Sequence, residues 1–144
     1  MATAESGEPL TLIGWSTGAG LAVLAAADEN KKGYDGLVAI SLGDTNILGW
    51  RWIDNLTYLT GRVPHEPRFQ SHDYLPGIAP LPIFIIQSSG DQFIPNDEAE
   101  QLFIQTKRPK HFKLIHAHNH TFDGNRASFF EALQHGLEWV REHR

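Results

Sequence analysis

The sequence predicts an α/β domain in which a mostly parallel sheet of about four strands carries helices on both faces. Two continuous apolar runs, residues 37–42 and 82–87, are typical of strands that are covered on both faces. Strand-like and helix-like segments alternate along the chain, as they do in doubly wound domains with right-handed crossovers. With 144 residues, 41% hydrophobic and 20% charged, the chain has the size and composition of a single domain.

The first elements form a strand, a sharp turn and a helix. Residues 9–13 are apolar and end at Gly14, and residues 18–27 are rich in Ala and Leu. Because that helix is apolar on nearly every side, we expect it to lie deep against the sheet.

The second half of the chain continues the alternation. The apolar strand 82–87 is followed by a predicted helix, 97–106, whose Asp97 and Glu100 have the spacing of a capping box. A short strand is predicted over 111–115 and an amphipathic helix over 125–143. The apolar residues at helical spacing in that last helix are Phe129, Phe130, Leu133, Leu137 and Val140.

Residues 43–81 are too long for a simple connection and form a cap-like insertion within the single domain 1–144. The insertion mixes aromatic residues with prolines. We expect a helix over 47–60 with Trp50, Ile53 and Leu56 facing inward, and a loop over the sheet edge for the rest. Segments of this kind are usually functional.

Charge and composition exclude several classes of protein. The net charge of -5, without a basic patch, argues against a nucleic-acid partner. The absence of cysteine excludes disulfides and a thiol nucleophile. The apolar runs are too short for a membrane span. Because residues 1–9 lack the features of a secretory signal, we expect a cytoplasmic protein, and no cofactor is implied.

One motif with a chemical meaning is Gly14-Trp15-Ser16-Thr17-Gly18, between the first strand and the first helix. It matches a nucleophile elbow, in which a strained turn projects the serine hydroxyl at the carboxyl edge of the sheet. Glycines two residues before and after the serine allow strand and helix to pack closely. A phosphate-binding turn is the alternative, but the spacing of the dinucleotide motif and the Walker lysine are both missing.

A serine nucleophile needs a base and an orienting carboxylate, in the chain order Ser, acid, His. Asp91 follows the strand 82–87, and His120 follows the strand 111–115. Parallel strands bring such positions to one edge of the sheet. Asp44 remains open as an alternative acid, and His118 as an alternative base.

The histidines invite one further hypothesis. His116, His118 and His120 alternate and form a possible zinc cluster, but no acidic ligand is interleaved, so we expect no metal. The remaining histidines are expected at the surface: His65, His72, His111, His135 and His143.

From its nucleophile strand to its last helix the chain resembles the carboxyl-terminal half of the α/β-hydrolase superfamily. Gly-Asp-Gln-Phe-Ile-Pro, at 90–95, is similar to that superfamily's acid loop, and Asn-His-Thr-Phe-Asp-Gly, at 119–124, to its histidine loop. More loosely, the segments around Ser16 and His120 resemble VirJ-like bacterial hydrolases. The resemblance implies a serine esterase in which Ser16 is the nucleophile, Asp91 the acid and His120 the base, with the Thr17 amide in the oxyanion hole.

The same resemblance implies an unusual architecture, because the superfamily places several strands before its nucleophile strand. One edge of the sheet would then be exposed, and a second copy or a partner that supplies the missing half would cover it. The substrate is expected to be a small ester or related acyl compound bound by Trp15, Trp50 and Trp52. The opposing hypothesis is a non-catalytic binding domain that keeps the triad as ancestry.

Overall fold

The main sheet has four parallel strands in the spatial order β1-β2-β5-β6, which confirms the predicted fold class. The computed structural model describes residue 8 and residues 10–28, 33–48 and 67–144. The strands of the sheet are β1 (Leu10–Trp15), β2 (Tyr34–Ile40), β5 (Ile83–Ser88) and β6 (Lys110–Ile115).

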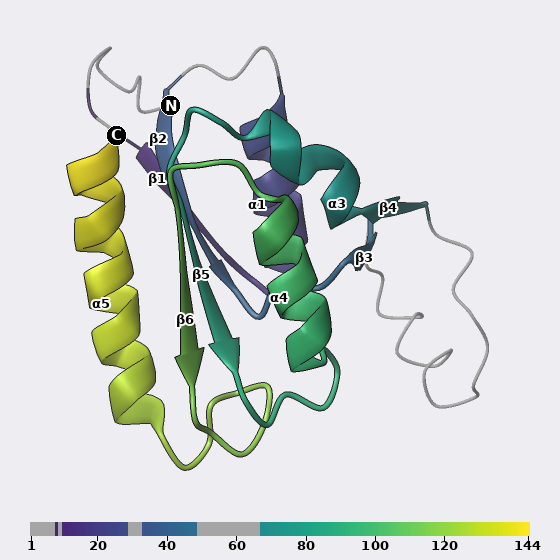
Figure 1. The fold of residues 1–144 in the computed structure, drawn as a ribbon, viewed down its shortest axis with the longest axis vertical. Coiled ribbons are helices and arrows are strands. Elements are labelled where there is room, and N and C mark those ends of the chain that lie inside the picture. The colour runs from purple at the N-terminus through teal and green to yellow at the C-terminus, as the bar shows by residue number, and fades with distance from the viewer. Residues whose placement is uncertain (1–7, 9, 29–32, 49–66) are drawn as a thin grey trace, which may run out of the picture.

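Helices cover both faces of this sheet (Figure 1). α1 (Thr17–Ala27), α3 (Ser71–Tyr74) and α4 (Asn96–Gln105) lie on one face, and α5 (Arg126–His143) lies on the other. None of the helices in the described part of the chain is long and apolar enough to cross a membrane.

The two central strands supply both halves of the core, because successive side chains of a strand point to opposite faces. In β2, Leu37 packs toward α1 and Val38 toward α5. In β5, Ile83 likewise packs on the α1 side of the sheet and Phe84 on the α5 side. This double coverage explains why both strands are continuously apolar in sequence.

The insertion is only partly as predicted. Residues Thr45–Ile47 form a short strand, β3, which pairs antiparallel with β4 (Arg68–Gln70), so Ile47 does not begin a helix. The rest of the expected helix lies among residues 49–66, outside the described residues. After β4 the chain forms α3 and a 3-10 turn, η1 (Leu75–Gly77), and the buried Leu75 joins the α1-side core. This part of the insertion is therefore core, and not a loop over the edge.

Three finer expectations are corrected. Leu21 of α1 is 41% exposed, so the helix has one open side. The capping box of α4 does not form: the N-cap is Pro95, without a side-chain cap. Phe130 of α5 is 62% exposed, because it lies beside the apolar face that Phe129 and Val140 bury.

One histidine expected at the surface is half-buried. The His111 ring of β6 stacks on Phe84, with 4.7 Å between ring centroids, and also contacts Trp139 of α5. Burial, followed by the charges of His135, Lys113 and His143, lowers the pKa of His111 below its usual 6.5. His111 thus belongs to the packing of α5 on the sheet.

Candidate active site

Ser16 occupies the sharp turn that the sequence predicts between β1 and α1. Its backbone has φ 56° and ψ −122°, in a region where non-glycine residues are strained. Its N–H donates to the carbonyl oxygen of Ile40 at 2.8 Å, which ties the turn to the end of β2. A serine at a helix N-cap commonly accepts a hydrogen bond from the first turn, but Ser16 makes none with its side chain. The Ser16 hydroxyl is therefore not used to cap α1.

The two glycines of the motif differ in what they do. A Cβ at Gly14 would collide with the Gly18 carbonyl oxygen and would lie 2.6 Å from the Ala19 Cα, so strand and helix meet there. A Cβ at Gly18 would meet no heavy atom within 4 Å. The close approach depends on Gly14, and the sequence argument for Gly18 is not supported.

Asp91 and His120 meet after β5 and β6. The Asp91 Oδ2 and His120 Nδ1 atoms are 2.7 Å apart. The Asp91 side chain is fully buried and that of His120 is 14% exposed. Since a carboxylate only accepts, Nδ1 carries a hydrogen, and in the neutral ring Nε2 then keeps the lone pair. The tautomer is the one that a general base requires.

Further hydrogen bonds stabilise the loop that carries Asp91 and join it to the loop that carries His120. The second oxygen of Asp91, Oδ1, accepts from the backbone N–H groups of Phe93 at 2.9 Å and Ile94 at 3.0 Å. The N–H of His120 donates to the Gln92 Oε1 at 3.0 Å. The acid loop and the histidine loop are thus joined twice, once through the carboxylate and once through Gln92.

Hydrogen bonds among its own residues also stabilise the loop that carries His120. The Asn119 Oδ1 accepts from the N–H groups of Thr121 and Asp123, and its Nδ2 donates to the Asp123 carboxylate at 2.7 Å. The bond from Asn119 and the bonds from Arg126 lower the pKa of Asp123. Asp123 therefore stays ionised as the anchor of the loop that carries His120.

Neither of the alternatives left open by the sequence takes part in the Asp91–His120 pair. The Asp44 carboxylate is bound by His72, whose Nδ1 lies 2.9 Å from each of its oxygens. His118 is exposed and has Gly124 against its ring. Among the described residues no three His, Cys, Asp or Glu side chains are arranged to hold a metal ion. The geometry pairs His120 with Asp91, and Asp44 with His72.

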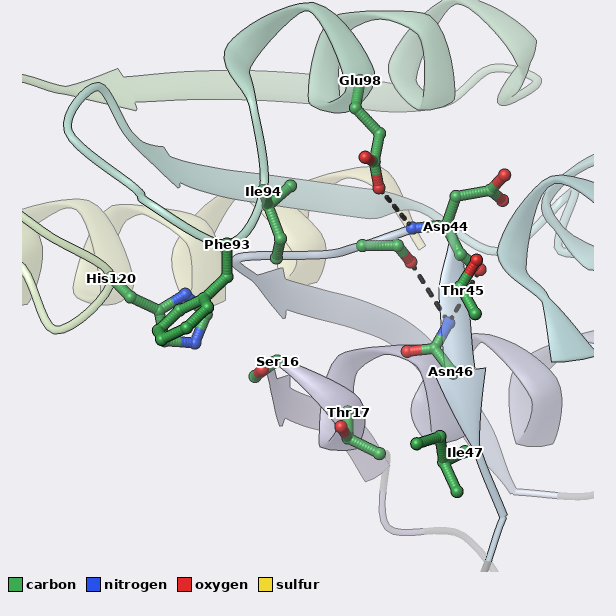
Figure 2. Close-up of a pocket in the computed structure, with 11 residues that line it drawn as sticks. Ser16, Thr17, Asp44, Thr45, Asn46, Ile47, Phe93, Ile94, Glu98 and His120 are labelled. Atoms are coloured by element: carbon green, nitrogen blue, oxygen red, sulfur yellow. Dashed lines mark hydrogen bonds between the residues drawn. The ribbon is translucent and has the colours of Figure 1, made fainter. Parts of the chain in front are cut away.

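Ser16, Thr17 and His120 line one cavity of about 650 Å³ at the carboxyl edge of the sheet (Figure 2). In Figure 2, Ser16 and Thr17 lie at the start of α1, and His120 lies to the left of Ser16. The other lining residues are Gly43, Asp44, Thr45, Asn46, Ile47, Phe93, Ile94 and Glu98. The cavity is therefore lined by Ser16, by the imidazole that Asp91 orients and by the first residue of α1.

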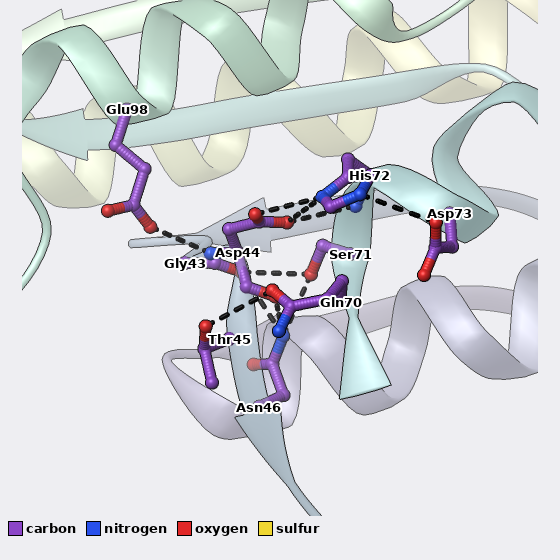
Figure 3. A network of polar contacts seen from close by, with 9 residues as sticks. All are labelled: Gly43, Asp44, Thr45, Asn46, Gln70, Ser71, His72, Asp73 and Glu98. Carbon is purple, nitrogen blue, oxygen red and sulfur yellow. Dashed lines mark hydrogen bonds and ion pairs between the residues drawn. The ribbon is translucent and has the colours of Figure 1, made fainter. Parts of the chain in front are cut away.

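One wall of this cavity is a polar network of the insertion (Figure 3). Buried Asn46 donates from Nδ2 to the Gly43 and Asp44 carbonyl oxygens and to the Ser71 hydroxyl. The Glu98 Oε1 accepts from the Asp44 N–H at 2.8 Å, so Glu98 fixes this wall where the sequence predicted a capping box. The hydrogen bond with Asp44 is the main cause that raises the pKa of exposed His72.

The aromatic residues expected to contact substrate are not brought together. Trp15 is absent from the cavity lining, and its ring packs on Phe122 and Phe129 on the α5 side. Trp50 and Trp52 lie outside the described residues. Among the described residues, Phe93 does line the cavity, although it was not predicted from the sequence to do so. Its position two residues after Asp91 was the available signal.

Comparison with known proteins places the fold. Neither the protein-family models nor the curated proteins searched contain a match. Among solved structures, the esterase domain of a Rhodothermus marinus protein is 20% identical, with a TM-score of 0.60 over 91% of this chain and 59% of its own. A monoacylglycerol lipase of Paleococcus ferrophilus is 17% identical, with a TM-score of 0.62 over 96% and 70%.

The Pyrococcus furiosus esterase Pf2001 is 16% identical, with a TM-score of 0.64 over 92% of this chain and 53% of its own. The chain thus spans little more than half the length of that esterase. Identities at this level establish the fold alone. The architecture of this chain is accordingly that of an α/β hydrolase, over part of the length of the solved examples.

Proposed function

We propose that this chain carries the catalytic centre of a serine hydrolase that acts on a carboxylic ester or a related acyl bond. The observation that carries the proposal is the buried 2.7 Å contact between Asp91 and His120, whose imidazole faces the cavity that Ser16 also lines. The solved structures with this fold include esterases and a monoacylglycerol lipase, which agrees with that reaction class.

In the proposed reaction, the Ser16 hydroxyl attacks the carbonyl carbon while the His120 Nε2 takes its proton. The tetrahedral intermediate collapses, and His120 returns the proton to the leaving alcohol, which leaves an acyl-Ser16 ester. Water, deprotonated by the same imidazole, then hydrolyses that ester and restores Ser16. Asp91 holds the tautomer and stabilises the imidazolium in both halves.

The negative oxygen of each tetrahedral intermediate needs hydrogen-bond donors. Thr17 is the first residue of α1, where backbone N–H groups have no acceptor within the helix, and it lines the cavity next to Ser16. We assign its amide as one donor. A typical oxyanion hole has a second donor, and each donor contributes about 10²- to 10³-fold to turnover.

The exposed edge of β1 supports a further part of this proposal. Among the described residues, β1 pairs with β2 and with no other strand, and Leu10 and Ile13 of β1 are each 53% exposed. Such an edge accepts another strand readily. We propose that a second copy of the chain, or a polypeptide that supplies further strands of the fold, covers this edge and completes the hydrolase.

The same edge favours a second candidate function, a binding domain without catalysis. In that case the exposed β1 residues bind a partner protein, and the Asp91–His120 pair only stabilises the two loops. Such a domain would fold and associate but would not react with a serine-directed reagent.

Hydrolysis of p-nitrophenyl acetate and butyrate, together with mass spectrometry after fluorophosphonate treatment, tests the proposal. Wild-type protein should turn over both esters and carry one adduct on Ser16. Ser16→Ala should lose both signals, whereas Ser128→Ala, on α5 and away from the cavity, should keep both. A folded wild-type protein with no adduct and no turnover would refute the hydrolase and favour the binding domain.

A further inference from the structure

Phe93 is an aromatic residue of the cavity wall, and much of its surface is open to solvent. Its side chain lines the cavity, and the residue is 62% exposed. The ring meets the His120 imidazole edge to face, with 5.3 Å between ring centroids and 88° between planes. In Figure 2 the two rings lie next to each other on the side of the cavity that faces Ser16. Because ligand pockets are lined mainly by hydrophobic and aromatic side chains, a ring in this position is available as a binding contact.

The ring is held there by the same group that orients the base. The Phe93 N–H donates to the Asp91 Oδ1, and the Asp91 Oδ2 binds His120. On the other side, Ile94 is buried and its carbonyl oxygen accepts from the Gln87 side chain at 3.1 Å. The backbone of Phe93 is therefore fixed at both ends, and its ring position follows that of the imidazole.

Among the described residues that line this cavity, few have large apolar side chains. They are Ile47, Phe93 and Ile94, and Ile94 is 7% exposed. The wall formed by Asp44, Thr45 and Glu98 is polar. Apolar parts of a ligand thus gain most by packing against Phe93.

The chemistry of acyl transfer decides which part of the substrate reaches this ring. A base that takes the serine proton must return it to the leaving oxygen, so the alcohol group of an ester leaves next to the imidazole. A side chain in contact with that imidazole lies beside the alcohol. We propose that Phe93 binds the apolar part of the leaving alcohol and sets the preference for that group, an inference that rests on the proposed hydrolase function.

Two series of alkyl esters test this assignment, each followed by proton release at constant pH. One series keeps acetate as the acyl group and lengthens the alcohol from ethyl to butyl to hexyl. The other keeps the ethyl group and lengthens the acyl chain over the same range. For the wild type, kcat/KM should rise along the alcohol series by about two- to fourfold per methylene.

Three variants test whether the Phe93 ring causes the preference for longer alcohol groups. Phe93→Ala should flatten the alcohol series and leave the slope of the acyl series unchanged, and Phe93→Leu, which keeps most of the apolar volume, should retain most of the alcohol slope. Phe130→Ala removes a ring of equal exposure, 62%, that does not line the cavity, and should leave both slopes as in the wild type. Urea unfolding verifies that each variant is folded.

Other outcomes overturn the assignment. If Phe93→Ala lowers kcat/KM for every ester by the same factor, the ring only supports His120. If it flattens the acyl series, the ring lies beside the acyl group. If the wild type hydrolyses no ester and Ser16 takes up no fluorophosphonate, the proposed hydrolase function is refuted, and this inference is refuted with it. If Ser16 carries the adduct but Phe93→Ala has the same alcohol slope as the wild type, only the Phe93 assignment is refuted.

Discussion

The two sides of the candidate active site are built to different degrees. On the β5–β6 side, the buried Asp91 carboxylate accepts three hydrogen bonds, and Gln92 adds a second link between the loops. On the β1 side, Ser16 follows an edge strand that carries exposed apolar residues. Contacts within the described residues thus hold Asp91 and His120, whereas Ser16 lies next to an edge where further packing is expected.

The largest loss of activity should come from a substitution on the β5–β6 side of the site, where Asp91 binds His120. Asp91→Asn preserves the shape of the side chain but favours the wrong tautomer of His120, and kcat for p-nitrophenyl butyrate should fall by about 10⁴-fold. Asp44→Asn is the matched control, because Asp44 is the acid that binds His72 instead. Its effect on kcat should be far smaller. Equal losses in the two variants would contradict the assignment of Asp91.

The nucleophile turn offers the next test. Gly14→Ala forces a Cβ into the Gly18 and Ala19 backbone, and the free energy of unfolding should fall by about 1–3 kcal/mol in urea titrations. Gly18→Ala meets open space, so its stability should be unchanged or higher by up to about 1 kcal/mol. If the two substitutions cost the same, the contact between β1 and α1 does not depend on Gly14.

The exposed edge can be altered without disturbing the core. Ile13→Lys places a charge on β1 at a side chain that is 53% exposed, so the stability of the monomer should change by no more than about 0.5 kcal/mol. Sedimentation velocity should show less self-association than in the wild type, because an edge charge opposes strand pairing. Unchanged association would mean that β1 is not the contact surface.

The smallest expected effect is a pH dependence on the opposite edge of the sheet. Burial lowers the pKa of His111 in the folded state, so the unfolded chain binds the proton more tightly. The contribution of neutral His111 to the free energy of unfolding is therefore fully present above pH 6.5, and it is lost as the pH falls through the folded-state pKa of His111. His111→Phe keeps the ring contact with Phe84 and should reduce the difference between urea midpoints at pH 7.5 and pH 5.5. An unchanged difference would assign this pH dependence to other groups.

Long segments with an unambiguous pattern of apolar residues were predictable from the sequence. The apolar runs that became β2 and β5, and the helical spacing that became α5, gave the four-strand sheet and its helices. The β3–β4 hairpin was missed because each strand has only three residues, too few to show a period. The capping box failed because α4 begins at Asn96 with Pro95 at the N-cap, so Asp97 lies inside the first turn instead of at the cap.

The sequence by itself determined that Ser16, Asp91 and His120 each follow a strand, because parallel strands bring their carboxyl ends to one edge of the sheet. It left two acids and two bases in equivalent positions. Only the tertiary structure decided that His120 binds Asp91, that His72 binds Asp44, and that Phe93 enters the cavity where Trp15 does not. The physical reason is that side-chain partners depend on the path and packing of loops, which strand order alone does not specify.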